Sequence, residues 1–137
     1  ALTGQARERL GDVFAASFRK RHPEAMEEAV TAARGKALRS PVLIVVGVDR
    51  PVTEKVVELE NVCAAAAAAQ NLLLAAHGLG LAAKWNTGDN ASDADVKAFF
   101  GFAPDQHLIA MIHIGYPLVE SAKPNRPGFE DRTVWME

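Results

Sequence analysis

Residues 62–88 read VCAAAAAAQNLLLAAHGLGLAAKWNTG and predict a long helix, a glycine turn and a short strand. Alanine is the strongest helix former, six alanines stand in a row at 64–69, and no Gly or Pro interrupts residues 52–77. From 62 to 69 the helix has no polar face, and a helix that is apolar all round must be buried on every side. In a chain of 137 residues this indicates burial by a second copy, so we expect a homodimer. The alternative is the central helix of a monomer.

The end of this helix contains a motif that falsely suggests a dinucleotide-binding site. Residues 78–83, GLGLAA, match the dinucleotide fingerprint G-x-G-x-x-G/A. That fingerprint works when its glycines follow a strand and open a helix, because the helix N-terminus then faces the pyrophosphate. Here the glycines end a helix and precede a short strand, which closes in a polar turn at residues 86–88. We therefore reject a Rossmann site.

Further strands and helices flank this stretch. Residues 42–48 and 108–114 are apolar on both faces except for His113, so we expect two buried strands. Leu10, Val13, Phe14 and Phe18 fall at helical spacing and predict an amphipathic first helix. We expect three further features: a second helix that opens at Pro23 and runs to about Lys36, a short helix capped by Ser92 and Asp95, and a C-terminal arm that docks through Trp135.

Composition excludes several classes of function. The net charge is -2 and the short basic cluster at 19–21 is typical of a solvated helix end, so we expect no nucleic-acid partner. The four histidines are not paired at metal-ligand spacing, so we expect no metal site, and we expect His113 in its strand to be a hydrogen-bonded core histidine rather than a ligand. Cys63 is the single cysteine and sits in an apolar stretch, where we expect a small buried core residue and a reducing compartment. The longest apolar run, 62–69, is far shorter than the roughly 20 residues of a membrane span, which predicts a soluble, cytoplasmic protein.

Three segments in this order resemble the nitroreductase family. They are residues 33–48 (ARGKALRSPVLIVVGV), 69–88 (AQNLLLAAHGLGLAAKWNTG) and 108–117 (LIAMIHIGYP). Each segment alone is moderately specific for the family, and the order and spacing of the three together are much more specific. The resemblance implies a single α+β domain over 1–137. It consists of a nitroreductase-like mixed sheet flanked by helices, with the long Ala-rich helix as the dimer helix of an intertwined homodimer and FMN at the subunit interface.

The resemblance also implies an activity. Family members transfer hydride from NADH or NADPH to FMN and pass electrons to nitroaromatics, quinones or similar small-molecule acceptors. No catalytic acid or base is expected among the side chains, because the flavin carries out the hydride chemistry and the protein positions it. Two alternatives remain open: a non-catalytic dimeric binding or structural module of the same fold, and a family member with other flavin chemistry such as reductive dehalogenation or flavin breakdown.

The resemblance assigns site residues by position. Trp85, Asn86, Thr87 and Gly88 match the segment that lies against the flavin, although some relatives carry Arg where this chain has Asn86. Lys123 and Arg126 match the basic residues near the FMN phosphate, with solvated tail charges as the alternative. A third segment matches the one assigned to nicotinamide contact, with a plain helix C-cap as the alternative; its residues are Ala76, His77, Gly78, Leu79, Gly80 and Leu81.

One part of the family pattern is missing from the sequence. The family begins with a helix that bears an Arg-Arg-Ser type motif and clamps the FMN phosphate, followed by a second helix and a first strand, and the sequence shows none of these. We expect the chain to be a portion of a longer protein, since the remaining core would otherwise expose apolar surface. The alternative is a true truncation with weak or no FMN binding.

Overall fold

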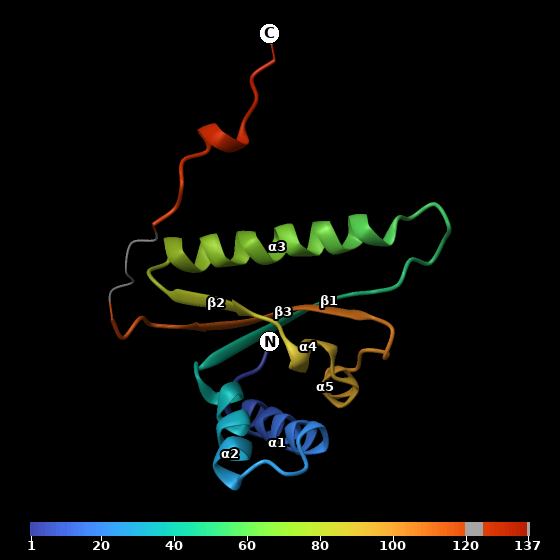
Figure 1. The fold of residues 1–137 in the computed structure, drawn as a ribbon, viewed down its shortest axis with the longest axis vertical. Helices are drawn as coiled ribbons and strands as arrows, with labels where there is room; N and C mark the ends of the chain where they lie inside the picture. Colours follow the sequence, from blue (N-terminus) through green and yellow to red (C-terminus); the bar gives the residue numbers. More distant parts are fainter. Residues whose placement is uncertain (120–124, 137) are drawn as a thin grey trace.

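The computed structural model describes residues 1–119 and 125–136, which build a three-layer α+β arrangement (Figure 1). Its middle layer is an antiparallel sheet in the order β1-β3-β2, with β1 at Val42–Val48, β2 at Ala82–Asn86 and β3 at His107–Gly115. Helix α3, Glu58–Gly78, lies along one face of the sheet. The other face carries α1 (Gly4–Arg21), α2 (Glu27–Gly35), α4 (Asp89–Ser92) and α5 (Ala94–Phe99). Short 3-10 turns, η1 (Lys36–Leu38) and η2 (Glu130–Arg132), complete the elements.

The α+β class and all three expected strands are confirmed. Successive side chains of a strand point to opposite faces, so each strand supplies both layers of core. On the α1 side the buried cluster includes Leu10, Phe14, Leu43, Val96 and Met111. On the α3 side Ala69, Ala110 and Ile112 are buried, and Trp85 packs against them. The predicted amphipathic first helix is confirmed, because Leu10 and Phe14 are buried in this core.

A β-bulge in β3 sets which side chains face which layer. Val46 pairs with Ala110 and Gly47 with Leu108, so Ile109 is an extra residue with no partner in β1. After the bulge, Ala110 and Ile112 pack toward α3, whereas Met111 belongs to the cluster on the α1 side. Asn86 of β2 pairs with Met111, and Lys84 pairs with His113. These paired side chains therefore share the α1 face of the sheet.

Among the described residues, helix α3 is covered on one side only. Ala69 and Ala76 are buried against the sheet, whereas Leu59 and Leu74 are 67% and 59% exposed on the outer face. Cys63 is also exposed, so the prediction of a buried cysteine is wrong for the single chain, because the residue points away from the sheet. By length and composition alone, α3 meets the test for a membrane span within the described residues. A core helix passes the same test, and the inner face of α3 packs on the sheet.

Two expected helix starts lie too early in the sequence. The long helix begins at Glu58 rather than near residue 52, because Val57 has extended backbone angles and the β-branched residues before it favour a loop. The second helix begins at Glu27 rather than at Pro23. Pro23 lies in a turn closed by a hydrogen bond from the Ala25 amide to the His22 carbonyl, 3.1 Å long.

Two further expectations are also corrected. The cap of the short helix α5 is Asp93, and not Ser92 with Asp95, because the Asp93 carboxylate accepts hydrogen bonds from the backbone amides of Asp95 and Val96. Trp135 is 81% exposed, and the C-terminal arm extends away from the sheet and helices rather than docking on them (Figure 1).

We expect Gly47→Ala to destabilise the fold. A Cβ at position 47 would stand 2.3 Å from the Phe102 ring, so the ring or the strand must move, and overpacking of this kind costs about 1–3 kcal/mol. Urea unfolding followed by circular dichroism measures the change. The control is Gly35→Ala, where no atom lies within 4 Å of the added Cβ, and it should be neutral or slightly stabilising. Equal stability of the two variants would contradict the tight packing of Phe102 on β1.

Candidate functional site

A hollow of about 340 Å³ opens on the α1 face of the sheet at the end of β2. Its apolar wall comes from the side chains of Phe14 and Phe18 on α1 and Met111 on β3. The remaining lining is polar or cationic and consists of Arg21, Lys36, Arg39, Asn86, Thr87, Gly88, Asp89, Asn90 and His113. The hollow thus combines an aromatic wall with hydrogen-bonding groups and cations, as sites for polar aromatic ligands do.

Gly88 shapes one side of this hollow. Its backbone has φ +84° and ψ -160°, a region that is essentially restricted to glycine. No atom lies within 4 Å of the position of an added Cβ, so the backbone here borders open space. A glycine in such a position lets a ligand approach the main chain closely. The predicted flavin-contact turn therefore has the local geometry that close contact requires.

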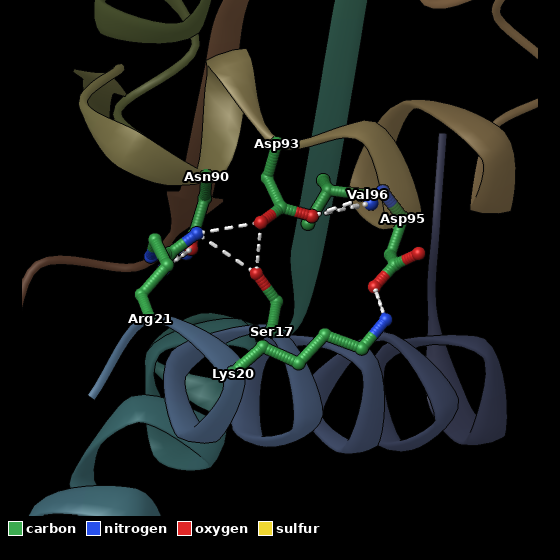
Figure 2. A network of polar contacts seen from close by, with 7 residues as sticks. All are labelled: Ser17, Lys20, Arg21, Asn90, Asp93, Asp95 and Val96. Atoms are coloured by element: carbon green, nitrogen blue, oxygen red, sulfur yellow. Dashed lines mark hydrogen bonds and ion pairs between the residues drawn. The ribbon is translucent and has the colours of Figure 1, made fainter. Parts of the chain in front are cut away.

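A polar network fixes the wall between α1 and the α4–α5 segment (Figure 2). Ser17 is fully buried and donates a hydrogen bond to the Asp93 carboxylate. Arg21 pairs with the same carboxylate at 2.6 Å, donates to Ser17 Oγ at 2.8 Å and reaches Asn90 at 3.4 Å. The network holds Arg21 at the rim of the hollow and neutralises its charge.

The other two residues of the basic cluster are also paired with acids. Arg19 pairs with Glu27, and Lys20 pairs with Asp95. The interpretation of residues 19–21 as a structural helix end rather than a nucleic-acid patch agrees with these pairs.

The surroundings of Asp93 favour its ionised form. Burial alone raises the pKa of this carboxyl, but hydrogen bonds from Ser17 and from the backbone amides of Val96 and Asp95, together with the Arg21 charge, outweigh it. The net effect is a pKa of Asp93 below its ordinary value. Asp93 thus joins three elements as a carboxylate.

A second hollow of about 250 Å³ adjoins the first along the sheet. The two share Arg39, Asn86 and His113, and the second adds Lys84 from β2. His113 Nδ1 lies 2.9 Å from Ser40 Oγ, so the expectation of a hydrogen-bonded histidine in this strand is confirmed. Burial, and then the charges of Arg39 and Lys84, lower the pKa of His113 below its ordinary value, so the ring is neutral at pH 7.

The predicted nicotinamide segment lies elsewhere. Gly80 has φ +74°, its amide donates to the His77 carbonyl at 3.0 Å, and the Leu81 amide donates to the Ala76 carbonyl at 2.9 Å. These two bonds form a Schellman motif, so the residues do make a helix C-cap. His77, Gly80 and Leu81 also line a third hollow of about 700 Å³ together with Leu73 and residues 117–119.

The structure brings together only some of the residues that were predicted to contact FMN. Asn86, Thr87 and Gly88 line the first hollow. Trp85 belongs to the same turn, but its side chain packs toward α3, where its indole N–H donates to the Ile109 carbonyl at 2.9 Å. Arg126 is exposed in the C-terminal arm, and Lys123 lies outside the described residues.

Sequence reasoning missed several lining residues, namely Phe18, Arg21, Lys36 and Arg39. Phe18 was assigned only to a helix face, Arg21 and Lys36 were assigned only to helix ends, and Arg39 was given no role. His113 did carry a signal, since it is the one polar residue between apolar neighbours in its strand, but it was assigned only a structural role.

The nitroreductase family model matches residues 1–116, which is most of the chain. The chain belongs to the nitroreductase family. A nitroreductase-like family protein from Bacillus cereus has 25% sequence identity to this nitroreductase-family chain and a TM-score of 0.78, with 98% of this chain and 70% of that chain covered. A candidate nitroreductase from Desulfovibrio desulfuricans, solved in complex with FMN, has 28% identity and a TM-score of 0.64, with 91% and 64% covered.

More distant structures share the fold alone. A nitroreductase from Bacteroides fragilis with bound FMN has 17% identity and a TM-score of 0.65, and the match covers all of this chain and 73% of that chain. The nitroreductase-family chain thus spans roughly two thirds to three quarters of the length of these three structures. No curated protein matches it at a significant level.

Removal of the Asp93 side chain should destabilise the packing of α1 against the α4–α5 segment. Asp93→Ala leaves buried Ser17 and two backbone amides without their acceptor, which costs about 1–3 kcal/mol. Asp93→Asn should cost less, because Asn still caps a helix but carries no charge for Arg21. Asp12→Asn, which removes a surface pair with Arg34, is the control and should cost at most about 1 kcal/mol.

The pH dependence of Asp93→Asn provides a second check. A carboxyl whose pKa is lower in the folded state stabilises the fold above its unfolded pKa of about 3.9, and this stabilisation is lost as the pH falls through the folded pKa. The stability difference between the wild type and Asp93→Asn should therefore shrink as the pH falls below about 4. A difference that is constant from pH 7 down to the acid transition would refute the charged role of Asp93.

Proposed function

We propose that this nitroreductase-family chain forms part of an FMN-dependent oxidoreductase that takes electrons from NADH or NADPH and reduces a nitroaromatic, a quinone or a similar small acceptor. The observation that carries the proposal is the first hollow, in which an aromatic wall faces the turn formed by Asn86, Thr87 and Gly88. Family membership and the FMN-bound relative from Desulfovibrio desulfuricans support the same cofactor.

The residues of the hollow fit a flavin chemically. Phe14 and Phe18 offer apolar surface to a fused ring, and the Asn86 and Thr87 side chains and nearby backbone amides offer hydrogen bonds to its polar edge. Bound FMN would supply the hydride chemistry, and this chain would orient it and exclude water from one side. Backbone donors at the Gly-containing turn would stabilise negative charge on the ring, as fixed dipoles do.

We further propose that the chain works as a homodimer through the outer face of α3. Leu59, Cys63 and Leu74 repeat on this face at helical spacing and are exposed in the single chain. The C-terminal arm presents Phe129 and Trp135, which are 62% and 81% exposed, and a second chain would cover both. An apolar surface of this extent is typical of a subunit interface.

The remaining assignments follow from this proposal. Residues 1–137 act as one domain in the cytoplasm, and the segment 76–81 contacts the nicotinamide donor beside the third hollow. We also propose that Lys123 and Arg126 contribute positive charge near the cofactor phosphate. A reducing compartment agrees with the single cysteine.

Gly88→Ala should weaken FMN binding, measured by quenching of flavin fluorescence. The forced backbone change costs about 1–3 kcal/mol, and the new methyl group stands where the cofactor approaches the chain. Gly101→Ala is a matched control, because Gly101 also has a positive φ, +79°, but lies outside the hollow; it should lose stability and keep its affinity for FMN. NADH or NADPH oxidation by the FMN-loaded wild type then tests the reaction. Wild-type protein that is folded but retains no flavin after desalting would contradict the proposed function for this chain.

Leu74→Glu should convert the dimer to a monomer. A charge in the centre of an apolar interface is left unpaired when two chains associate, whereas it is solvated in the separate chain. Light scattering after size-exclusion chromatography gives the mass directly. The control is Arg9→Glu at an exposed polar residue of α1, outside the proposed interface, and it should leave the mass unchanged. A wild-type protein that is monomeric at micromolar concentration would overturn the dimer proposal.

A further inference from the structure

We propose that Lys36, Arg39 and His113 form a site for a phosphate monoester, and that His113 takes up a proton when the phosphate binds. This site lies on the described chain itself, apart from the arm residues Lys123 and Arg126. The identity of the molecule that carries the phosphate rests on the proposed function. The location of the site rests on the geometry of the two adjoining hollows.

The first line of support is a set of cations with no acid beside them. Lys36 and Arg39 line the first hollow, and Arg39 and Lys84 line the second. Within residues 1–119 and 125–136, no carboxylate lies within 4.0 Å of the charged groups of these three side chains. The contrast with Arg21 is clear, because Arg21 lines the same hollow but is neutralised by Asp93. An anion is the partner that these cations lack.

The second line of support is the tautomer of His113, which the Ser40 hydroxyl determines. Ser40 Oγ donates its single proton to the Val42 carbonyl at 2.7 Å, because a carbonyl can only accept. At the 2.9 Å contact with His113, Ser40 Oγ must therefore be the acceptor and Nδ1–H the donor. Arg7 holds the same serine through its carbonyl at 2.5 Å. The ring nitrogen left for a ligand is Nε2, which carries no proton while the ring is neutral.

The charges around His113 explain why ligand binding and protonation are coupled. Arg39 and Lys84 face the ring from the turn before β1 and from β2, and Lys36, Arg21 and Asp89 share its hollow. Burial and the two facing cations lower the pKa of His113. A bound dianion reverses the sign of the local field and favours the imidazolium, whose Nε2–H can then donate to a phosphate oxygen.

The chemistry of the donors selects phosphate among anions. A phosphate monoester carries up to two negative charges near neutral pH and three acceptor oxygens. Lys36, Arg39 and protonated His113 supply three cationic donors in one place. A carboxylate carries a single negative charge, so it would balance less of the positive charge of these three donors.

The test is an NMR titration of the His113 ring, with inorganic phosphate or chloride at equal ionic strength. The pKa of His113 should rise by about one unit or more in phosphate. Arg39→Gln should abolish most of this shift, whereas the exposed Arg9→Gln on α1, outside the hollow, should leave it unchanged. Acetate should give a smaller shift. An unchanged pKa in phosphate, or an equal shift in Arg39→Gln, would overturn the inference.

Calorimetry in two buffers of different ionisation enthalpy then identifies the carrier of the phosphate. If the carrier is FMN, its binding takes up protons at pH 7, riboflavin binding takes up none, and His113→Gln loses the uptake. If proton uptake accompanies the binding of NADPH but not of NADH or FMN, the phosphate belongs to the electron donor, and this result also supports the site. A phosphate-dependent shift without any flavin binding would support the site and refute the proposed function. Equally tight binding of FMN and riboflavin, without a phosphate-dependent shift of the His113 pKa, would support the proposed function and refute the phosphate site.

Discussion

The register of β3 determines which side chains support α3 and which line the candidate site. This strand lies between β1 and β2, so a slip by one residue would exchange every side chain between the two faces of the sheet. The bulge at Ile109 places Ala110 and Ile112 under α3 and turns Met111 toward α1. One extra residue thus separates the core beneath the long helix from the lining of the candidate site.

The two faces of the sheet then have different roles. On the α3 side the residues are small or apolar and support a helix whose outer face is left uncovered by residues 1–119 and 125–136. On the α1 side polar groups collect where β2 ends, and the network centred on Asp93 holds α1 against the α4–α5 segment. Because Asp93 caps α5 and also binds Arg21, a single carboxylate joins the local helix to the wall of the hollow.

The sequence predicted those features that depend on local pattern. The apolar runs gave both buried strands, and the positions of Gly78 and Gly80 after a helix excluded a Rossmann site, which agrees with the Schellman motif that ends α3. The family resemblance, now confirmed, pointed to the turn at Asn86, Thr87 and Gly88, which borders the first hollow.

Features that depend on contacts distant in sequence were missed. Nothing near Arg39 or Ser40 in the sequence shows that β1 and β3 place them beside His113, 73 residues after Ser40. The cap at Asp93 rather than Ser92 is likewise chosen by Ser17 and Arg21, which arrive from another helix. Burial on every side of the Ala-rich helix was expected from composition, whereas the described part of the chain covers only one of its faces.

We propose that a flavin occupies the hollow between α1 and the end of β2. Two-dimensional amide NMR of the protein titrated with FMN tests it most directly. We expect the largest shifts in residues 86–90 and in the C-terminal half of α1, around Phe14 and Phe18. Shifts confined to the third hollow, around Leu73, His77 and Leu81, would contradict it.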